Sequence, residues 1–143
     1  VCSSDLTTGV TPRRSAQGIE SSRLAMLLAV LERRSAIAFG LLEVYASVVG
    51  GVRLNDPGSD LAVCLALASA ALDKPTHADI VALGEVGLGG EVRHVSHLER
   101  RIIEAERMGF RRVIIPVNSK APDNGRSTLV RVATVNDALA HAL

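Results

Sequence analysis

Apolar residues recur at helical spacing near the start of the chain. The positions that form this stripe are Leu24, Leu27, Leu28 and Leu31. Because residues at i, i+3, i+4 and i+7 lie on one face of a helix, the pattern predicts an amphipathic helix. We expect Ser21 or Ser22 to cap its start, since a hydroxyl oxygen can accept a hydrogen bond from the first turn. We expect the helix to end near Arg34.

A second segment, residues 61–72, is apolar on nearly all sides and is interrupted only by Ser69. A helix without a polar face belongs in the middle of a domain, so we expect this segment to form a central helix capped by Ser59 or Asp60. Cys64 would then be a small core residue. No apolar run reaches the roughly 18 residues that span a bilayer, and we expect no membrane partner.

Short apolar runs bounded by turn residues predict strands. These runs are residues 45–49, 80–83, 112–116 and 129–132. The glycines Gly50 and Gly51 end the first run, and glycine alternates with apolar residues over 84–92, which predicts a tight hairpin.

Two further helices are predicted from capping signals. Ser96 and Glu99 have the spacing of a capping box, and Thr134 with Asp137 opens a short final helix through residue 143. The helix after Ser96 has an apolar stripe of Leu98, Ile102, Ala105 and Met108, followed by Gly109 as a C-terminal signal. Since strands and helices interleave, we expect an α/β or α+β fold with both faces of the sheet partly covered.

The first residues carry none of these patterns. We expect residues 1–6 to be a non-native leader and leave them out of the fold prediction. Residues 7–19 are rich in Thr, Gly and Pro, which predicts a linker or extended arm. A single domain then spans residues 20–143.

The composition narrows the class of protein. The chain has 143 residues, which fits one domain, and a formal net charge of +1. This balance excludes a strongly basic nucleic-acid module as a whole but is compatible with a local basic patch. Aromatic residues make up only 2%, too few for a surface that stacks bases. Two cysteines do not form a disulfide framework and no signal-peptide pattern is present, so we expect a cytoplasmic location.

Motifs for nucleotide hydrolysis and metal binding do not emerge from the sequence. The loop G-x-x-x-x-G-K-[ST] does not occur, and the glycines of residues 84–90 have no lysine among them. Glu91, His94 and His97 are spaced three apart, but no cysteine or aspartate joins them at a ligand spacing. We interpret the two histidines as exposed residues at a helix entry and expect no metal.

Between residues 57 and 116 a series of short features matches a known family. They are Pro57, the helix through Cys64, Pro75, Ala78-Asp79, Gly84-Glu85-Val86, Leu88, Gly90-Glu91-Val92, Leu98, Gly109 and Ile114-Ile115-Pro116. In these features the chain resembles the proteolytic domain of Lon proteases. The resemblance implies that family's fold, a mixed sheet with packed helices like domain 2 of ribosomal protein S5.

The resemblance also implies that both catalytic positions are degenerate. The family carries its serine directly after the proline of a D-G-P-S-A-G turn, where this chain has Gly58, and its lysine where this chain has Arg101. Glycine has no nucleophile, and a guanidinium stays protonated and cannot act as a general base. Ser59 stands one residue late, which turns its side chain by about 100°. We interpret Ser59 as a helix cap. A Ser-Lys peptidase is the alternative hypothesis, and it would need Lys74 or Lys120, which both fall in predicted loops, to replace the missing lysine.

Five segments carry a closer resemblance, which covers nearly the whole chain. They are residues 13–18 (RRSAQG), 22–34 (SRLAMLLAVLERR), 44–45 (VY), 48–54 (VVGGVRL) and 60–63 (DLAV). In these segments the chain resembles the C-terminal domain of the RadA (Sms) family of bacterial DNA-repair proteins. That family carries a Lon-like domain without the protease residues.

This second resemblance implies a role within a larger protein. Proteins of the family combine a zinc finger, a RecA-like ATPase and this domain, and they process recombination intermediates by branch migration alongside RecA. The resemblance implies ATP, magnesium and zinc as cofactors of the parent protein and none for this chain. It implies that this chain helps to assemble a homohexameric ring and contacts single-stranded or branched DNA. A purely structural oligomerisation module is a second alternative.

The basic residues favour DNA contact independently of the resemblance. Of 16 basic residues only two are lysines, and arginine is the better bidentate phosphate binder. The paired arginines that we consider candidates for DNA binding are Arg33 and Arg34, Arg100 and Arg101, and Arg111 and Arg112. Two pairs on one face would form a phosphate-binding track. The alternative is that the pairs are solvated helix ends that neutralise nearby glutamates.

Overall fold

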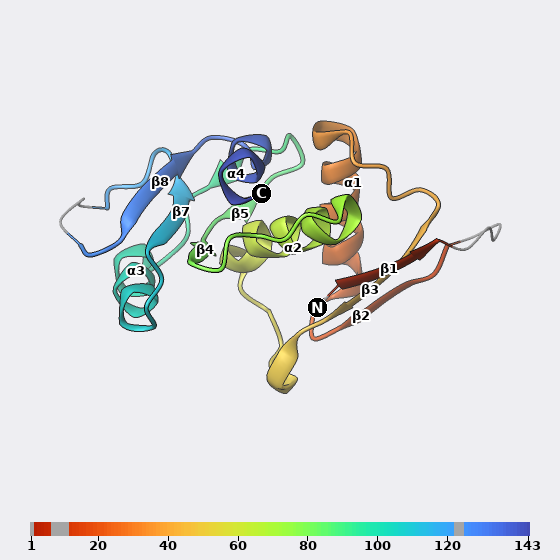
Figure 1. The fold of residues 1–143 in the computed structure, drawn as a ribbon, viewed down its shortest axis with the longest axis horizontal. Coiled ribbons are helices and arrows are strands. Elements are labelled where there is room, and N and C mark those ends of the chain that lie inside the picture. The colour runs from red at the N-terminus through yellow and green to blue at the C-terminus, as the bar shows by residue number, and fades with distance from the viewer. Residues whose placement is uncertain (1, 7–11, 122–124) are drawn as a thin grey trace.

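The first sheet of the molecule is built around strand β3 (Leu42–Ser47), which lies between β1 (Cys2–Leu6), antiparallel to it, and β2 (Arg14–Gln17), parallel to it. The structure is a computed structural model that describes residues 2–6, 12–121 and 125–143 (Figure 1). Along β3, Val44 and Ala46 are buried while the residues that follow each of them are exposed. This alternation turns one face of the strand toward the core.

The two outer strands correct the predicted organisation of the N-terminus. The sequence pattern predicts no element over residues 1–6, yet β1 pairs along its whole length with β3. The described part of the predicted linker contains β2, so it belongs to the sheet, whereas residues 7–11 lie outside the described residues. Edge strands form through backbone N–H and C=O groups, which every sequence carries, so the missing apolar pattern did not exclude them. The non-native origin of residues 1–6 stays a prediction.

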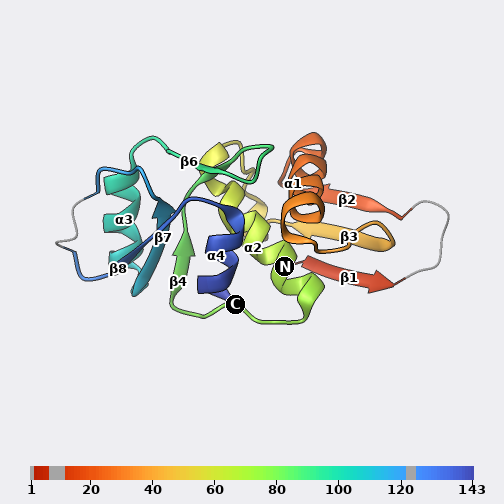
Figure 2. The same cartoon turned by 90° about the horizontal axis from the view of Figure 1, so that it is seen from above.

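Helix α2 (Asp60–Leu72) lies in the middle of the molecule, packed between α1 (Ser21–Ser35) and α4 (Val135–Ala142) (Figure 2). The three helices share one large cluster of buried apolar side chains. Cys64 has no solvent exposure, and burial raises the pKa of its thiol to about 12. The central place of this helix and the core role of Cys64 are therefore confirmed. Within the described residues, no helix has both the length and the apolar character needed to cross a membrane.

The second sheet consists of three parallel strands in the order β4 (Ile80–Ala82), β7 (Arg112–Pro116) and β8 (Thr128–Val132). The predicted strand 112–116 is confirmed at both ends, and the other two are displaced by one residue at most.

Helix α3 (Leu98–Arg107) covers one face of this second sheet. Val113 and Ile115 of β7 point into a cluster with α3, whereas Ile114 points into the cluster around α2, and all three are fully buried. Since the alternate residues of β7 are buried on opposite sides, the prediction that both faces of the sheet are covered is confirmed for this sheet.

A short hairpin of β5 (Glu85–Val86) and β6 (Val92–Arg93) joins the two halves of the molecule and confirms the predicted turn. Gly90 has a φ of +81°, and a Cβ there would lie 3.1 Å from the Cγ of Arg34 on α1. The carbonyl of Gly90 accepts a hydrogen bond from the backbone N–H of Val135 at 2.9 Å. The hairpin tip is thus fixed against the end of α1 and the start of α4.

The helix caps follow the sequence signals only in part. The capping box of Thr134 and Asp137 is present at the start of α4, so this prediction is confirmed. The N-caps of α1 and α3 are instead Glu20 and His97, without a side-chain capping bond, so the serine caps and the Ser96 capping box are wrong. Met108 lies past the last turn of α3 and is 69% exposed, so it does not belong to the apolar stripe.

The arrangement of the strands differs from the one mixed sheet implied by the resemblance. The described strands form two three-stranded sheets and the hairpin. After β3 the chain passes through η1 (Val49–Gly51), in which Gly50 and Gly51 have φ of +86° and +69°. These left-handed conformations turn the chain out of the first sheet toward α2. The α/β class is confirmed, with helices and strands interleaved.

Candidate functional site

The turn before α2 is held by hydrogen bonds to three parts of the chain. Within η2 (Pro57–Ser59), the backbone N–H of Gly58 donates to the Asp56 carboxylate at 2.8 Å. The carbonyl of Gly58 accepts a hydrogen bond from Gly84 at 3.0 Å, and the carbonyl of Gly84 accepts one from Leu61 at 3.1 Å. These bonds fix the buried Gly58 between the start of α2 and the end of β4.

Arg101 reaches this turn from the first turns of α3. Its guanidinium forms an ion pair with the Asp56 carboxylate, and its Nε donates to the carbonyl of Ser96 at 2.9 Å. A Cβ built on Gly58 would lie 3.2 Å from Nη1 of Arg101 and 3.1 Å from Oδ1 of Asp56. The structure therefore places side by side the two positions at which the Lon resemblance implies a serine and a lysine.

The chemistry of this arrangement is that of a charge pair. The hydrogen bond from Gly58, and then the Arg101 guanidinium, hold the pKa of Asp56 below its usual range. A carboxylate with a lowered pKa is a weak base, and a guanidinium is no base at neutral pH. The space that a side chain at position 58 would need is filled by these two groups. The turn can bind charge, and it offers no activated nucleophile at Gly58.

Ser59 does not act as the predicted cap of α2. It occupies the N-cap position, but no capping hydrogen bond reaches its side chain. Its Oγ donates instead to the carbonyl of Asp56 at 2.7 Å, which closes the turn. Lys74 follows the far end of α2, and Lys120 lies in the loop after β7. Neither lysine has a hydrogen bond to Ser59 among the described residues.

An ion pair between a buried carboxylate and a partly exposed arginine, beside the turn, was not predicted from the sequence. Asp60 is 3% exposed, and its Oδ1 accepts a hydrogen bond from Nε of Arg23 at 2.9 Å. Its other oxygen accepts from a terminal nitrogen of Arg23 and from the backbone N–H of Val86 at 3.1 Å. The hydrogen bonds that Arg23 donates to Asp60 raise the pKa of Arg23. One carboxylate therefore joins α1, α2 and β5. The sequence gives no signal for this role, because the partners of Asp60 are 37 and 26 residues away from it.

In each arginine pair beside α3, one guanidinium is paired and one is not. Arg101 is engaged by the turn, and Arg112 donates to both carboxylate oxygens of Asp79, at 2.8 and 3.4 Å. This contact lowers the pKa of Asp79. Arg100 and Arg111 are exposed and have no ion-pair or hydrogen-bond partner for their side chains in the part of the chain that the structure describes. The two pairs flank opposite ends of α3.

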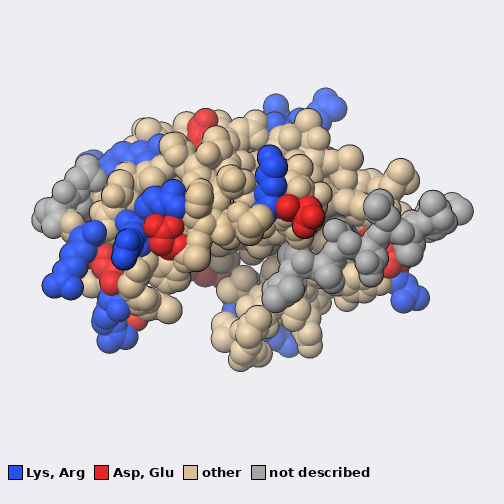
Figure 3. Space-filling model, in the orientation of Figure 1, with Lys and Arg blue, Asp and Glu red and all other residues tan. Residues whose placement is uncertain are grey.

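Arg33 and Arg34 lie elsewhere, exposed at the C-terminal end of α1. The carbonyl of Arg34 accepts a hydrogen bond from Nδ2 of Asn136 at 2.8 Å, which ties this end of α1 to α4. Basic side chains gather over α3, β7 and β8, and a separate group projects near the end of α1 (Figure 3). Because α1 and α3 lie on opposite sides of α2, the structure does not bring the α1 pair together with the α3 pairs.

The histidines considered for metal binding do not join Glu91. The Glu91 carboxylate accepts a hydrogen bond from Nε of Arg93 at 3.1 Å, and its pKa is lowered by backbone N–H groups and by this arginine. His94 and His97 instead line a surface hollow with Arg100. Among the described residues, no group of three or more His, Cys, Asp or Glu is placed to hold a metal ion.

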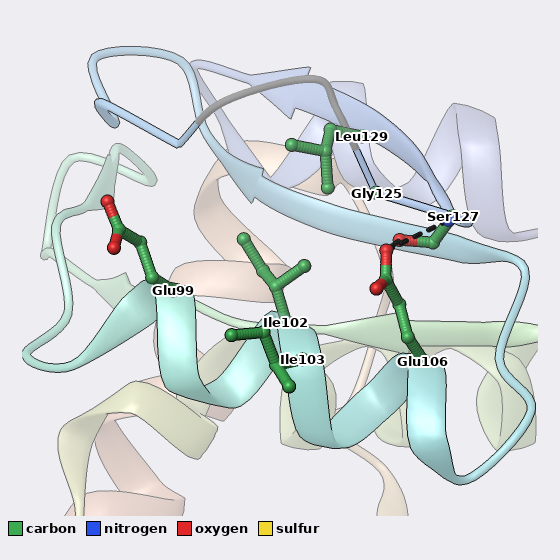
Figure 4. Close-up of a pocket in the computed structure, with 7 residues that line it drawn as sticks. All are labelled: Glu99, Ile102, Ile103, Glu106, Gly125, Ser127 and Leu129. Atoms are coloured by element: carbon green, nitrogen blue, oxygen red, sulfur yellow. Dashed lines mark hydrogen bonds between the residues drawn. The ribbon is translucent and has the colours of Figure 1, made fainter.

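A groove between α3 and β8 was also not predicted. It has a volume of about 260 Å³ and a floor of Ile102, Ile103 and Leu129, with a glutamate toward each end (Figure 4). Glu106 accepts hydrogen bonds from the backbone N–H and the Oγ of Ser127, at 3.0 and 2.8 Å, which lower its pKa. Glu106 is therefore used to hold the loop before β8 against α3.

Comparison with known proteins finds relatives named DNA repair protein RadA. The chain is 44% identical to the DNA repair protein RadA of Escherichia coli over 90% of its length, and 42% identical to that of Halalkalibacterium halodurans over 90%. It is 39% identical to the RadA of Synechocystis over 96% of its length. The chain spans about a quarter of these relatives, at 28%, 28% and 27% of their lengths. The resemblance to the RadA family, predicted from five segments, is confirmed.

A sequence family described as subunit ChlI of Mg-chelatase also matches, over residues 49–119. The matched stretch begins after β3 and ends after β7, so it contains the turn with Gly58, helix α2, the hairpin and α3. The charge pair of Asp56 and Arg101 thus lies inside a stretch that is similar in more than one group of proteins.

Proposed function

Since this chain is similar over nine-tenths of its length to DNA repair proteins named RadA, we propose that it is a Lon-like, non-proteolytic part of such a protein. In this proposal the chain has no catalysis of its own. It serves DNA repair by assembling subunits and by contacting DNA. The parent protein supplies ATP hydrolysis with magnesium, and a zinc finger, and it acts in the cytoplasm with RecA on recombination intermediates.

The observation that supports the non-proteolytic role is that position 58, a glycine, lies beside the guanidinium of Arg101. A Ser-Lys peptidase needs a hydroxyl and an amine within hydrogen-bond reach. Here a hydrogen atom stands in place of the hydroxyl side chain, and a guanidinium paired with Asp56 stands in place of the amine. Arg101 and Asp56 form a pair of opposite charges that stabilises the turn, so position 101 has a structural use in this chain.

Exposed guanidinium groups support the contact with DNA. Arg33, Arg34, Arg100 and Arg111 are exposed, and none of their side chains has a protein partner among the described residues. Such groups can form bidentate hydrogen bonds with phosphate oxygens. Arg101 and Arg112 are already engaged by carboxylates, so we assign them to the fold and the four exposed arginines to DNA.

DNA contact is tested by fluorescence anisotropy with a labelled single-stranded oligonucleotide at low salt. We expect the chain to bind, with an affinity that falls as salt rises, because bound phosphates release counterions. The variant with Arg33, Arg34, Arg100 and Arg111 all changed to Gln should bind much more weakly. The control variant Lys74→Gln, which changes an exposed lysine at the far end of α2, should bind like the unchanged chain. No binding by the unchanged chain would favour a purely structural module.

Proteolysis is tested separately with an unfolded protein substrate. We expect no cleavage by the unchanged chain over hours. Cleavage that is abolished by Ser59→Ala would overturn the non-proteolytic assignment and favour the peptidase hypothesis.

A further inference from the structure

A basic hollow lies at the start of α3, beside the turn with Gly58 but separate from it. It has a volume of about 410 Å³ and is lined by His94, His97, Leu98, Glu99, Arg100 and Lys120. These residues come from the loop after β6, from the first turn of α3 and from the loop after β7. Three side chains with nitrogen donors from the stretch 94–100 therefore meet a fourth, Lys120, from a segment about 20 residues further along the chain.

The polar side chains of the hollow form no hydrogen bonds or ion pairs with the rest of the described chain. His94, His97, Arg100 and Lys120 are all exposed, and none of their side chains has a hydrogen-bond or ion-pair partner among the described residues. The single carboxylate, Glu99, also lacks such a partner there. This differs from the neighbouring Arg101, whose guanidinium is held by a carboxylate and a carbonyl.

We propose that this hollow holds a phosphate group of a DNA backbone. The inference rests on the proposed contact of this chain with DNA, and it assigns that contact to a site whose histidines and lysine were not among the predicted residues. Arginine offers two parallel N–H donors to phosphate oxygens, lysine offers a compact positive charge, and imidazole offers ring N–H donors. All four groups are exposed and line the same hollow, so a strand that lies across this surface has access to them.

The first test is the salt dependence of binding to a labelled single-stranded oligonucleotide. The variant Arg100→Gln/Lys120→Gln should lower the slope of log affinity against log salt by about 0.7, the value expected for one lost phosphate contact on a single strand. The matched control, Arg53→Gln/Lys74→Gln, also removes two exposed positive charges but lies outside the hollow. Its slope should stay close to that of the unchanged chain.

The outcomes separate this inference from the proposed function. An unchanged slope in the hollow variant, or an equal fall in the control, overturns the phosphate site while DNA contact itself stands. Failure of the unchanged chain to bind DNA overturns both.

The second test uses the four histidines of the chain as probes. On addition of the oligonucleotide, the imidazole ¹⁵N and ¹H resonances of His94 and His97 should shift, whereas those of His77 and His141, which lie outside the hollow, should not. A parallel titration with inorganic phosphate distinguishes the source of the ligand. Shifts at His94 and His97 with phosphate but not with the oligonucleotide would overturn the assignment to DNA.

The variant His97→Gly removes one donor without disturbing the backbone. His97 has a φ of +55°, a conformation that glycine adopts more readily than histidine, so the variant should fold. We expect it to weaken oligonucleotide binding severalfold at low salt. If the folded His97→Gly variant and the His94→Gln variant both bind the oligonucleotide with the affinity of the unchanged chain, the histidines are excluded from the site.

Discussion

Arg100 and Arg101 are neighbours in sequence and have opposite roles in the structure. Arg101 points to the turn before α2, where Asp56 neutralises it, whereas Arg100 lines a hollow in which the described residues leave it unpaired. Consecutive residues on a helix point about 100° apart, which is enough to place one inside a contact and the other in solvent. The comparison teaches that paired charges in this molecule hold the fold, and that its unpaired charges are the ones available to a partner.

The strongest test of this distinction is the pair of the buried Asp60 and the partly exposed Arg23. Asp60→Ala should lower the free energy of unfolding by about 3 kcal/mol, because it leaves the guanidinium and the N–H of Val86 without their acceptor. Urea unfolding followed by circular dichroism measures this loss. The control Glu99→Ala, at an exposed carboxylate, should change stability by less than about 0.5 kcal/mol. Equal effects of the two variants would contradict the distinction.

A smaller effect is expected where the turn meets Arg101. Gly58→Ala should cost about 1–2 kcal/mol, because its Cβ would press against Asp56 and Arg101 at 3.1 and 3.2 Å. At Gly40 the nearest atom to a new Cβ is 3.8 Å away, so Gly40→Ala is a matched control that should be neutral. Thermal unfolding of both variants gives the comparison, and a neutral Gly58→Ala would show that the turn has room for a side chain.

The pair of Asp56 and Arg101 should make stability depend on pH. The pKa of Asp56 is lowered in the folded chain, so its contribution is present above the unfolded pKa and is lost as the pH falls through the folded pKa. Asp56→Asn should therefore cost about 1 kcal/mol at neutral pH, a modest value because the pair is partly exposed, and less in acid. Unfolding experiments from pH 7 down to pH 3 measure the difference. A constant difference over this range would show that the carboxylate charge does not stabilise the turn.

The smallest effect is expected at Arg100 itself. Arg100→Gln should leave stability within about 0.5 kcal/mol of the unchanged chain, since the side chain is exposed and has no partner among the described residues. Arg101→Gln should cost more in the same measurement. Reversal of this order would mean that the hollow, and not the turn, contributes the stabilising contact.

Local patterns predicted the elements well where burial determines the sequence. The apolar run of residues 61–72 gave the place of α2, and β7 is apolar because both of its faces are covered. The predicted serine caps of α1 and α3 were wrong. A serine near a helix start is a weak signal, because the backbone conformation of the folded chain decides which residue becomes the N-cap. β1 and β2 were not predicted, because an edge strand is held by backbone hydrogen bonds, which need no pattern of apolar side chains.

The candidate site was less predictable for a related reason. The contact of Gly58 with Arg101 followed from a family resemblance, and no local pattern could have indicated it. The Asp60–Arg23 pair joins residues from two helices. In the sequence, Asp60 is only an aspartate at a predicted helix start, which indicates a helix cap as readily as an ion pair. The hollow forms only where the loop after β7 brings Lys120 to the start of α3, so from the sequence alone its histidines resembled isolated exposed residues.

The docking of α4 has a consequence for how the protein is made. Val135, Ala138 and Ala142 are fully buried in the same cluster as the leucines of α1, and Asn136 bonds to the end of α1. During synthesis, part of the apolar face of α1 therefore stays exposed until residues 135–142 have left the ribosome. The core around α1 is complete only when residues 135–142 are available, and until then the partly folded chain depends on its surroundings to avoid aggregation.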